Sequence, residues 1–248
     1  VGHQAGKAGF EQFLDGDCTE LFERFLQGLA QIFGHQFRIA VGATEGFGTL
    51  ILAPHLAQLT RKHPHLSIDL LALPRMLHLS RREADIVISL ERPTRGSVIV
   101  SRLSDYSLYL YGQREYLARK PLVATREDLR HHAFVSYVDD LLFTKELQFL
   151  DALHQPERFA FRSTSITAQY EAVRAGAGLA VLPAFLADRD PVLTRVLPQE
   201  GQFTRTFWMS MPSESKHLAR MQVTWAFLRE TVAAQQELLK PKAVRGEC

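Results

Sequence analysis

The 248-residue sequence has only two cysteines, Cys18 and Cys248, near opposite ends of the chain. Two distant cysteines supply neither a disulfide framework nor the closely spaced thiols of a zinc site. Their scarcity favours a reducing, cytoplasmic setting. No apolar run approaches transmembrane length, and the first residues contain no signal-peptide core. We therefore expect a cytoplasmic protein without membrane contact.

The sequence also lacks a large excess of basic residues, because its formal net charge is only +2. This nearly neutral balance provides no electrostatic footprint for nucleic acid. The Gly-x-Ser-x-Gly elbow of hydrolases and the phosphate-binding P-loop are both missing. The glycines of AGAGLA follow an expected helix instead of opening one, so they predict a helix end rather than a dinucleotide site. These absences argue against an enzyme and against a cofactor.

The segment REDLRHH at 126–132 has a spacing that two metal ligands on a helix could share. Glu127 and His131, like Asp128 and His132, stand four residues apart, as two ligands on a helix would. No third ligand follows from the spacing. Acids in a first turn and histidines in a last turn also complement the helix dipole. We expect no metal here.

The remaining composition, 46% apolar and 23% charged, is ordinary for a globular protein. At this length the chain can form one large domain or two compact lobes, each with a core. Residues 1–36 predict an N-terminal tail and one amphipathic helix, in which Leu21, Phe25, Leu29 and Ile32 recur at helical spacing. The apolar stripe of this helix needs a partner surface.

From residue 37 onward, apolar runs alternate with helical patterns, which predicts an α/β protein with a mostly parallel sheet. The expected strands are 37–42, 66–72, 85–90, 97–103, 107–112, 133–138, 179–183 and 205–211. The expected helices are 50–63, 113–119, 125–130, 144–154, one after residue 165 and one over 218–232. Pro54 lies inside the first helix, so that helix should start late or bend there.

Two helix starts carry hydroxyl residues. ATEG at 43–46 separates a strand from a helix, and Ser163, Thr164 and Ser165 precede another helix. Such hydroxyls commonly cap helices, but helix N-termini at the ends of strands also bind ligands in open α/β sheets. If two lobes faced each other, Thr44 and Ser165 would point into one cleft. We therefore predict that Ser165 contacts a small ligand besides capping its helix.

The chain resembles the effector-binding region of LysR-type transcriptional regulators over about residues 37–235. The resemblance rests on four segments in order: FRIAVGATEGFGTLILAPHLAQLTRKHPHLSIDLL, ADIVISLERP, DYSLYLYGQREYLA and STSITAQYEAVRAGAGLAVLPAFLA. It implies a type 2 periplasmic-binding-protein-like fold, with two Rossmann-like lobes joined by two crossover strands. Lobe I would comprise 37–104 and 205–240, and lobe II 107–202, with crossovers near 103–110 and 202–208. Residues 241–248 would form a C-terminal tail.

The resemblance also implies a small-molecule effector bound between the lobes. By position, Thr44 and Ser165 match the family's residues at the two helix starts, and Val135 or Ser136 matches the strand end across the cleft. Glu45 and Thr164 adjoin these positions and complete the expected effector-binding set. A carboxylate at Glu45 would disfavour an anionic ligand unless it turned outward.

The expected partners are the effector and further copies of the chain, in a homodimer or homotetramer that uses the helix around Leu56 to Lys62. DNA would be bound only through a winged helix-turn-helix, which these 248 residues do not contain. The alternative is a solute-binding receptor of a transport system with the same two-lobed fold.

Overall fold

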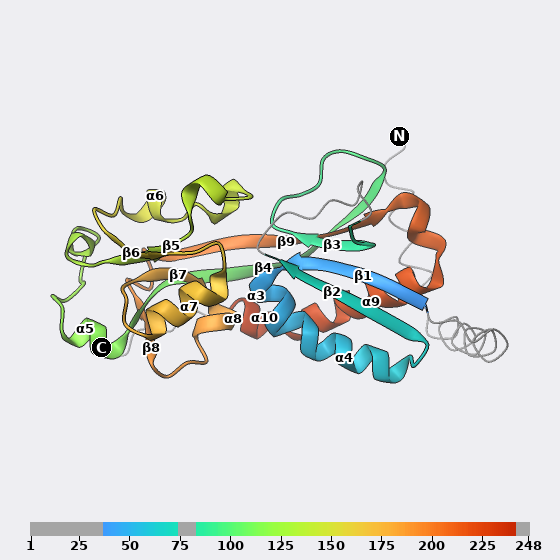
Figure 1. Cartoon of the computed structure of the whole chain (residues 1–248), viewed down its shortest axis with the longest axis horizontal. Coiled ribbons are helices and arrows are strands. Elements are labelled where there is room, and N and C mark those ends of the chain that lie inside the picture. Colours follow the sequence, from blue (N-terminus) through green and yellow to red (C-terminus); the bar gives the residue numbers. More distant parts are fainter. Residues whose placement is uncertain (1–36, 74–82, 242–248) are drawn as a thin grey trace.

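The computed structural model describes residues 37–73 and 83–241. The helix expected within residues 1–36 and nearly all of the expected C-terminal tail lie outside these ranges. The described elements form an elongated molecule with two groups of strands and helices along its long axis (Figure 1). We name these groups lobe I and lobe II.

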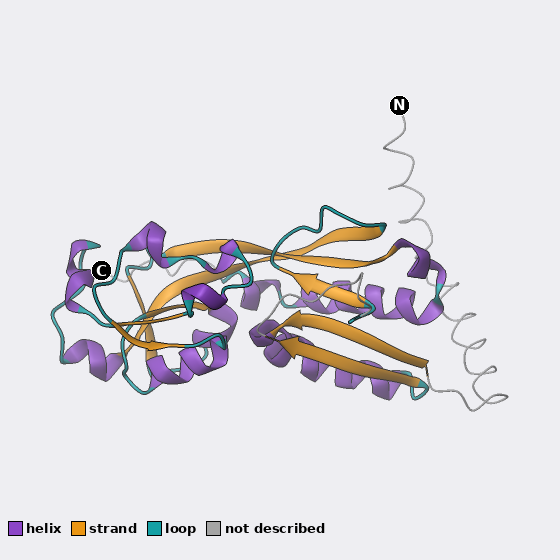
Figure 2. Ribbon diagram, turned by 45° about the horizontal axis from the view of Figure 1, so that its top comes forward, coloured by secondary structure: helices purple, strands orange, loops and turns teal. Residues whose placement is uncertain are grey.

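Lobe I is built on three neighbouring strands, of which β1 pairs in parallel with both others. The strands are β1 (Phe37–Thr44), β2 (Leu66–Leu73) and β3 (Ile86–Ser89). The helices are α3 (Glu45–Phe47), α4 (Ala53–Lys62), α9 (Ala219–Ala234) and α10 (Gln236–Leu239). In Figure 2 the longer helices run alongside these strands. Each strand lies close to its expected position.

Lobe II contains shorter elements. Its strands are β5 (Phe134–Ser136), β6 (Phe159–Arg162), β7 (Ala180–Pro183) and β8 (Leu193–Val196). Its helices are α5 (Arg114–Ala118), α6 (Leu150–Leu153), α7 (Ile166–Arg174) and α8 (Ala184–Ala187). The helix expected over 125–130 is a 3₁₀ turn at Glu127–His131, and that expected over 144–154 is divided into a 3₁₀ turn at Lys145–Leu147 followed by α6.

Two long strands, β4 (Val98–Gln113) and β9 (Gln202–Pro212), run through both lobes side by side (Figure 1). They pair antiparallel from Val98 opposite Pro212 to Tyr109 opposite Gln202, with an irregularity between Arg102 and Ser104. The strands expected at 97–103 and 107–112 are therefore one long strand. β4 and β9 contain the two crossovers that the family resemblance implies.

The expectation of a mostly parallel sheet was wrong. β9 is antiparallel to both β3 and β4, and β4 is antiparallel to β7 and β8 as well. Only the β1–β2, β1–β3 and β5–β6 pairs of named strands are parallel within the described residues. The cause is topological, because β4 leads the chain from lobe I to lobe II and β9 leads it back, so the two strands run in opposite directions. The sequence of an apolar strand does not show whether its neighbour is parallel or antiparallel.

The helix after β1 begins earlier than expected, at Glu45, and passes through a π-helical turn at Gly48–Leu52 before α4. In this turn the Ala53 N–H donates to the Gly48 carbonyl, five residues back. Pro54 follows at the start of α4, inside the continuous helical run from Glu45, where it lacks the N–H that would continue the helical bonds. The irregularity predicted at Pro54 is thus a π-helical turn. As a result, Glu45 lies in the first helical turn, directly after β1.

The glycines after α7 form the helix end that the sequence predicts. Gly176 has φ +80°, and its N–H donates to the Val173 carbonyl, while Ala177 N–H donates to the Ala172 carbonyl. This pair of bonds is a Schellman motif, which requires the left-handed backbone that glycine adopts readily. The chain then enters β7 directly.

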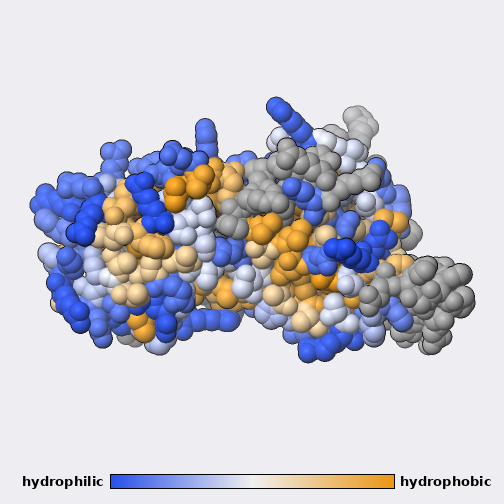
Figure 3. Space-filling view, in the orientation of Figure 1, coloured by the Kyte–Doolittle hydropathy of each residue, from blue (hydrophilic) through white to orange (hydrophobic). Residues whose placement is uncertain are grey.

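The core extends continuously from lobe I into lobe II. Leu56 and Leu59 of α4 point into it and are buried, as are Trp225 and Leu228 of α9. Hydrophobic residues on the visible face gather toward the middle of the molecule, and hydrophilic residues cover the outer end of lobe II (Figure 3).

Candidate functional site

A small cavity of about 40 Å³ lies between the two lobes. Lobe I contributes the end of β1 and α3, the crossover strands contribute their central residues, and lobe II contributes β7, the start of α7 and the loops after β5. The lining residues are Thr44, Glu45, Gly46, Phe47, Leu90, Tyr106, Leu108, Tyr137, Phe143, Leu147, Thr164, Ile166, Pro183, Phe185 and Phe207. A water molecule needs about 10–15 Å³, so this space admits roughly three.

The carboxylate of Glu45 crosses from lobe I to the N-terminus of α7 in lobe II. Its Oε1 accepts a hydrogen bond from the Ser165 hydroxyl at 2.7 Å, and its Oε2 accepts one from the Ile166 N–H at 3.0 Å. A carboxylate is stabilised here because helix N–H groups are unpaired and the helix dipole is positive at this end. Glu45 therefore turns inward and occupies a position that suits an anion.

Ser165 has two roles at this point. Besides donating to Glu45, its Oγ accepts a hydrogen bond from the Ala168 N–H at 3.0 Å, which is the geometry of a helix N-cap. The Ser163 hydroxyl in turn accepts from the Ser165 N–H at 3.1 Å. The capping role expected of the hydroxyl run is present, and a ligand contact by Ser165 stays a prediction.

Three of the six predicted site residues, Thr44, Glu45 and Thr164, line the cavity, and Ser165 is hydrogen-bonded to one of them. Val135 is buried within β5, where its N–H donates to the Leu179 carbonyl, and it is not part of the lining. Ser136 lines an adjoining hollow of about 400 Å³ in lobe II.

Tyr137, one residue after Ser136, lines both the cavity and that adjoining hollow. A ligand contact by Val135 or Ser136 stays a prediction, and the residue after β5 that lines the cavity is Tyr137.

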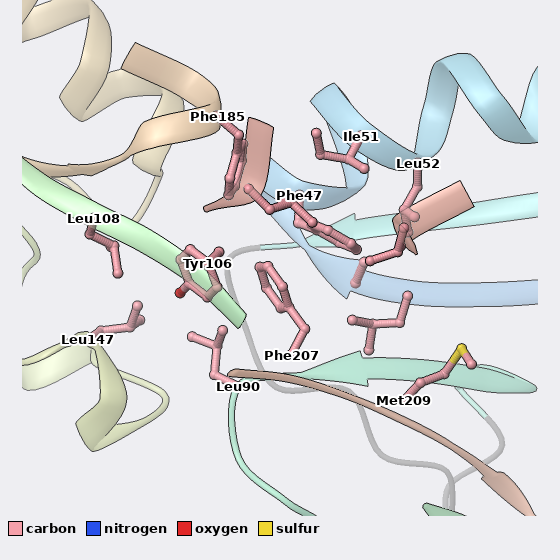
Figure 4. Packing of buried hydrophobic residues seen from close by; sticks show 14 of the residues in the cluster. Phe47, Ile51, Leu52, Leu90, Tyr106, Leu108, Leu147, Phe185, Phe207 and Met209 are labelled. Carbon is pink, nitrogen blue, oxygen red and sulfur yellow. The ribbon is translucent and has the colours of Figure 1, made fainter. Parts of the chain in front are cut away.

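Aromatic rings form much of the cavity wall, and sequence reasoning did not single them out. Phe207 packs between Phe47, at a centroid distance of 4.1 Å, and Tyr106, at 4.3 Å. Phe185 lies edge-on to Phe47 at 6.3 Å. Figure 4 shows these rings together, with the Tyr106 hydroxyl directed toward the side of Leu108 and Leu147. The alternation of Tyr106 and Leu108 along one face of β4 was a signal, but it is equally typical of a core strand.

The cavity is electrostatically simple. Among the described residues, Glu45 is the one charged side chain in its lining. Burial raises the pKa of Tyr137 well above its usual value, and the charge of Glu45 raises it further. Burial likewise raises the pKa of Tyr106, with a contribution from Tyr137. Both phenols therefore stay neutral and are able to donate hydrogen bonds.

The segment REDLRHH forms structural contacts. The Asp128 carboxylate accepts hydrogen bonds from the N–H groups of Ala124 and Thr125, and a ring nitrogen of His132 lies 3.1 Å from the Pro121 carbonyl oxygen. Across residues 37–73 and 83–241, no group of three or more His, Cys, Asp and Glu side chains could hold a metal ion. Within the same ranges no helix is both long and apolar enough to span a membrane.

Two lobes joined by a pair of antiparallel crossover strands, with a cavity between them, define a domain of the type 2 periplasmic-binding-protein class. Residues 34–233 match the family model described as the LysR substrate binding domain. The chain therefore belongs to the LysR substrate-binding domain family, and it is the effector-binding domain of a LysR-type transcriptional regulator, not an enzyme.

Two curated relatives agree with this assignment. An uncharacterized HTH-type transcriptional regulator of Haemophilus influenzae is 23% identical over 67% of this chain and 60% of its own length. The Mau operon transcriptional activator of Paracoccus denitrificans is 31% identical over 55% of this chain and 44% of its own length. The chain thus spans 60% of the length of the first relative and 44% of the length of the second.

Solved structures share the fold at low sequence identity. The CrgA regulatory domain of Neisseria meningitidis superposes with a TM-score of 0.68 at 21% identity, over 79% of this chain and 99% of that one. The effector domain of AmpR from Pseudomonas aeruginosa gives 0.65 at 19% identity, over 81% and 98%. Full-length AphB of Vibrio cholerae gives 0.63 at 20% identity, over 90% and 78%.

Proposed function

We propose that this domain senses a small metabolite in the cavity between its lobes and thereby controls DNA binding by a winged helix-turn-helix elsewhere in the regulator. The observation that carries the proposal is the hydrogen bond from Ser165 of lobe II to Glu45 of lobe I, at 2.7 Å, because Glu45 also lines the cavity. Because lining residues come from both lobes, a ligand there has different contacts when the lobes are close and when they are apart. Such a difference shifts the population between two lobe arrangements, and that shift is the signal.

We further propose boundaries of 37–104 with 205–240 for lobe I and 107–202 for lobe II, and a cytoplasmic setting. The position of the cavity against the middle of β4 and β9 supports this division, since Tyr106 and Phe207 line it. Family membership favours a regulator over the solute receptor considered above.

We also propose a homodimer, or a homotetramer of such dimers, that uses α4. Leu56 and Leu59 are buried in the domain's own core, so contact would have to use the outer side of the helix. Arg61 and Lys62 are exposed on that side. A dimer through this helix would link neighbouring domains without covering the cavity.

The effector is best sought by a thermal-shift screen of the chain against a metabolite library, because a ligand that binds only the folded state raises its Tm. Each hit is then tested with Tyr137→Phe, which removes a hydroxyl from the cavity lining. The matched control is Tyr109→Phe, because the buried Tyr109 hydroxyl has no hydrogen-bond partner and is not part of the lining.

We expect hits whose affinity falls in Tyr137→Phe and is retained in Tyr109→Phe. Absence of any hit, or hits with equal affinity for both variants, would contradict ligand sensing at this cavity.

A further inference from the structure

The lining of the cavity combines one carboxylate with aromatic rings and neutral hydroxyls. Among the described residues, Glu45 supplies the carboxylate, and no arginine, lysine or histidine lines the space. An anionic ligand would therefore enter without a counter-charge and would face the charge of Glu45. It would also find the N-terminus of α7 already taken, because Glu45 holds the Ile166 N–H at 3.0 Å.

Glu45 retains the capacity to bind a ligand while it holds lobe II. An ionised carboxylate offers about four lone-pair positions. Two are used by the Ser165 hydroxyl and the Ile166 N–H, one on each oxygen. The remaining positions can accept N–H groups from a ligand in the cavity that Glu45 lines. A charge-assisted bond of this type is about twice as strong as a neutral one.

The aromatic wall favours the same ligand chemistry. Phe47, Phe185, Phe207 and Tyr106 all line the cavity. Aromatic faces attract organic cations through the ring quadrupole, and groups of rings are used to recognise alkylammonium ions. The same rings favour the alkyl part of such a ligand by hydrophobic contact.

The cavity volume limits the size of the ligand. A cavity of about 150 Å³ is known to hold a benzene molecule, and this one has only about 40 Å³. Only a compact group enters without separation of the lobes.

We propose that the effector is a compact organic ammonium ion, bound by Glu45 and the aromatic wall of the cavity. This inference rests on the proposed function, because it specifies the ligand class of the same site. Entry of the ammonium group places its N–H donors on Glu45 and its alkyl group against Phe47 and Phe207. The ligand thereby adds to the contacts that Glu45 makes with α7, and favours the arrangement in which the lobes are close.

The test compares ligands that differ only in the polar group. Ethylamine, ethanol and propanoate share an ethyl group, and isobutylamine, isobutanol and 3-methylbutanoate share an isobutyl group. Binding to the whole chain is measured by isothermal titration calorimetry at constant ionic strength and neutral pH. The variants are Glu45→Gln and, as a matched control, Glu115→Gln, which removes an exposed carboxylate of α5 outside the cavity.

We expect the amines to bind at least tenfold more tightly than the alcohols, and the carboxylates to bind least. Glu45→Gln should remove the preference for the amines, and Glu115→Gln should retain it. Since the Glu45→Gln variant lacks the charge that holds α7, its folding is checked by circular dichroism and by a retained affinity for the alcohols or for a hit from the metabolite screen.

Carboxylates that bind as well as the amines, amines that do not bind the wild-type chain, or an unchanged amine affinity in Glu45→Gln would each overturn the ammonium assignment. A neutral or anionic hit from the library whose affinity depends on Tyr137 would overturn this assignment alone and leave the proposed function intact. Absence of any hit from the library would count against the proposed function instead.

Discussion

The bond between Glu45 and Ser165 should have a measurable energy, and a double-mutant cycle isolates it. Ser165→Ala removes the cap on the Ala168 N–H and the hydrogen bond to Glu45 together. A cap contributes about 1 kcal/mol. A hydrogen bond to a charged group contributes about 1.5–3 kcal/mol, and partial exposure of this site favours the lower end.

The expected loss in Ser165→Ala is therefore about 2.5 kcal/mol in the free energy of unfolding, the sum of both contributions. For a domain of this size that corresponds to a fall in Tm of roughly 5–10 °C. Ser163→Ala is the comparison, since it removes one neutral bond, from the Ser165 N–H to the Ser163 hydroxyl. Its loss should be about 0.5–1.5 kcal/mol.

The assay is urea unfolding followed by circular dichroism for the wild type, Ser165→Ala, Glu45→Gln and the double variant. Because the two side chains are in direct contact, the cost in the double variant should be smaller than the sum of the single costs by about 1–2 kcal/mol. Additivity within about 0.5 kcal/mol would show that the bond between the two lobes does not form in solution, and would refute the reasoning.

If effector affinity is measured on the same variants, Ser165→Ala should weaken it and Ser163→Ala should affect it little. Loss of stability with unchanged affinity would mean that Ser165 acts only as a cap.

Four further outcomes can be checked. Gly48→Ala should lower stability by about 1–3 kcal/mol in urea unfolding, because its Cβ would lie 2.7 Å from the Cβ of Ala72, and full stability would contradict the close packing of the π-helical turn on β2. Burial opposes ionisation of Asp190, but hydrogen bonds from Tyr170, the Val192 N–H and Arg174 outweigh it and lower its pKa. The stability it contributes is complete above the unfolded pKa of about 4 and is lost as pH falls through the lower folded value, so Asp190→Asn should flatten the acid side of a plot of Tm against pH. Light scattering should give at least a dimer, and a strict monomer at high concentration would exclude the proposed assembly. A gel shift with these 248 residues should show no sequence-selective DNA binding that resists salt, given the net charge of +2.

Local sequence information determined where the main elements lie. Continuous apolar runs located the buried strands β3 and β7, since a strand covered on both faces favours apolar residues at successive positions. Helical spacing of Leu218, Met221, Trp225 and Leu228 located α9 to within a few residues.

Cap and helix-end signals were equally reliable. Ser165 and Gly176 act within one helical turn, so their roles depend on neighbours in the sequence and follow from the residue types. A shared cleft for Thr44 and Ser165 was predicted from the two helix starts, and the family resemblance supplied the two facing lobes that this prediction required.

The direction of strand pairing was decided only by tertiary structure. The antiparallel course of β9 between β3 and β4 depends on how the chain returns between the lobes, and the apolar pattern of β9 is the same for either direction. The aromatic wall has the same origin: Phe47, Tyr106, Phe185 and Phe207 come from four separate elements, and each alone is typical of a core residue.

The orientation of Glu45 was likewise beyond local reasoning. Its position after β1 fixed that it would lie near the cleft, but a side chain at a helix start can turn outward to water or inward to a partner. The partner here, the N-terminus of α7, is 121 residues away in the sequence. Glu45 turns inward because folding brings unpaired N–H groups and a hydroxyl within reach of its carboxylate, and that juxtaposition exists only in the folded chain.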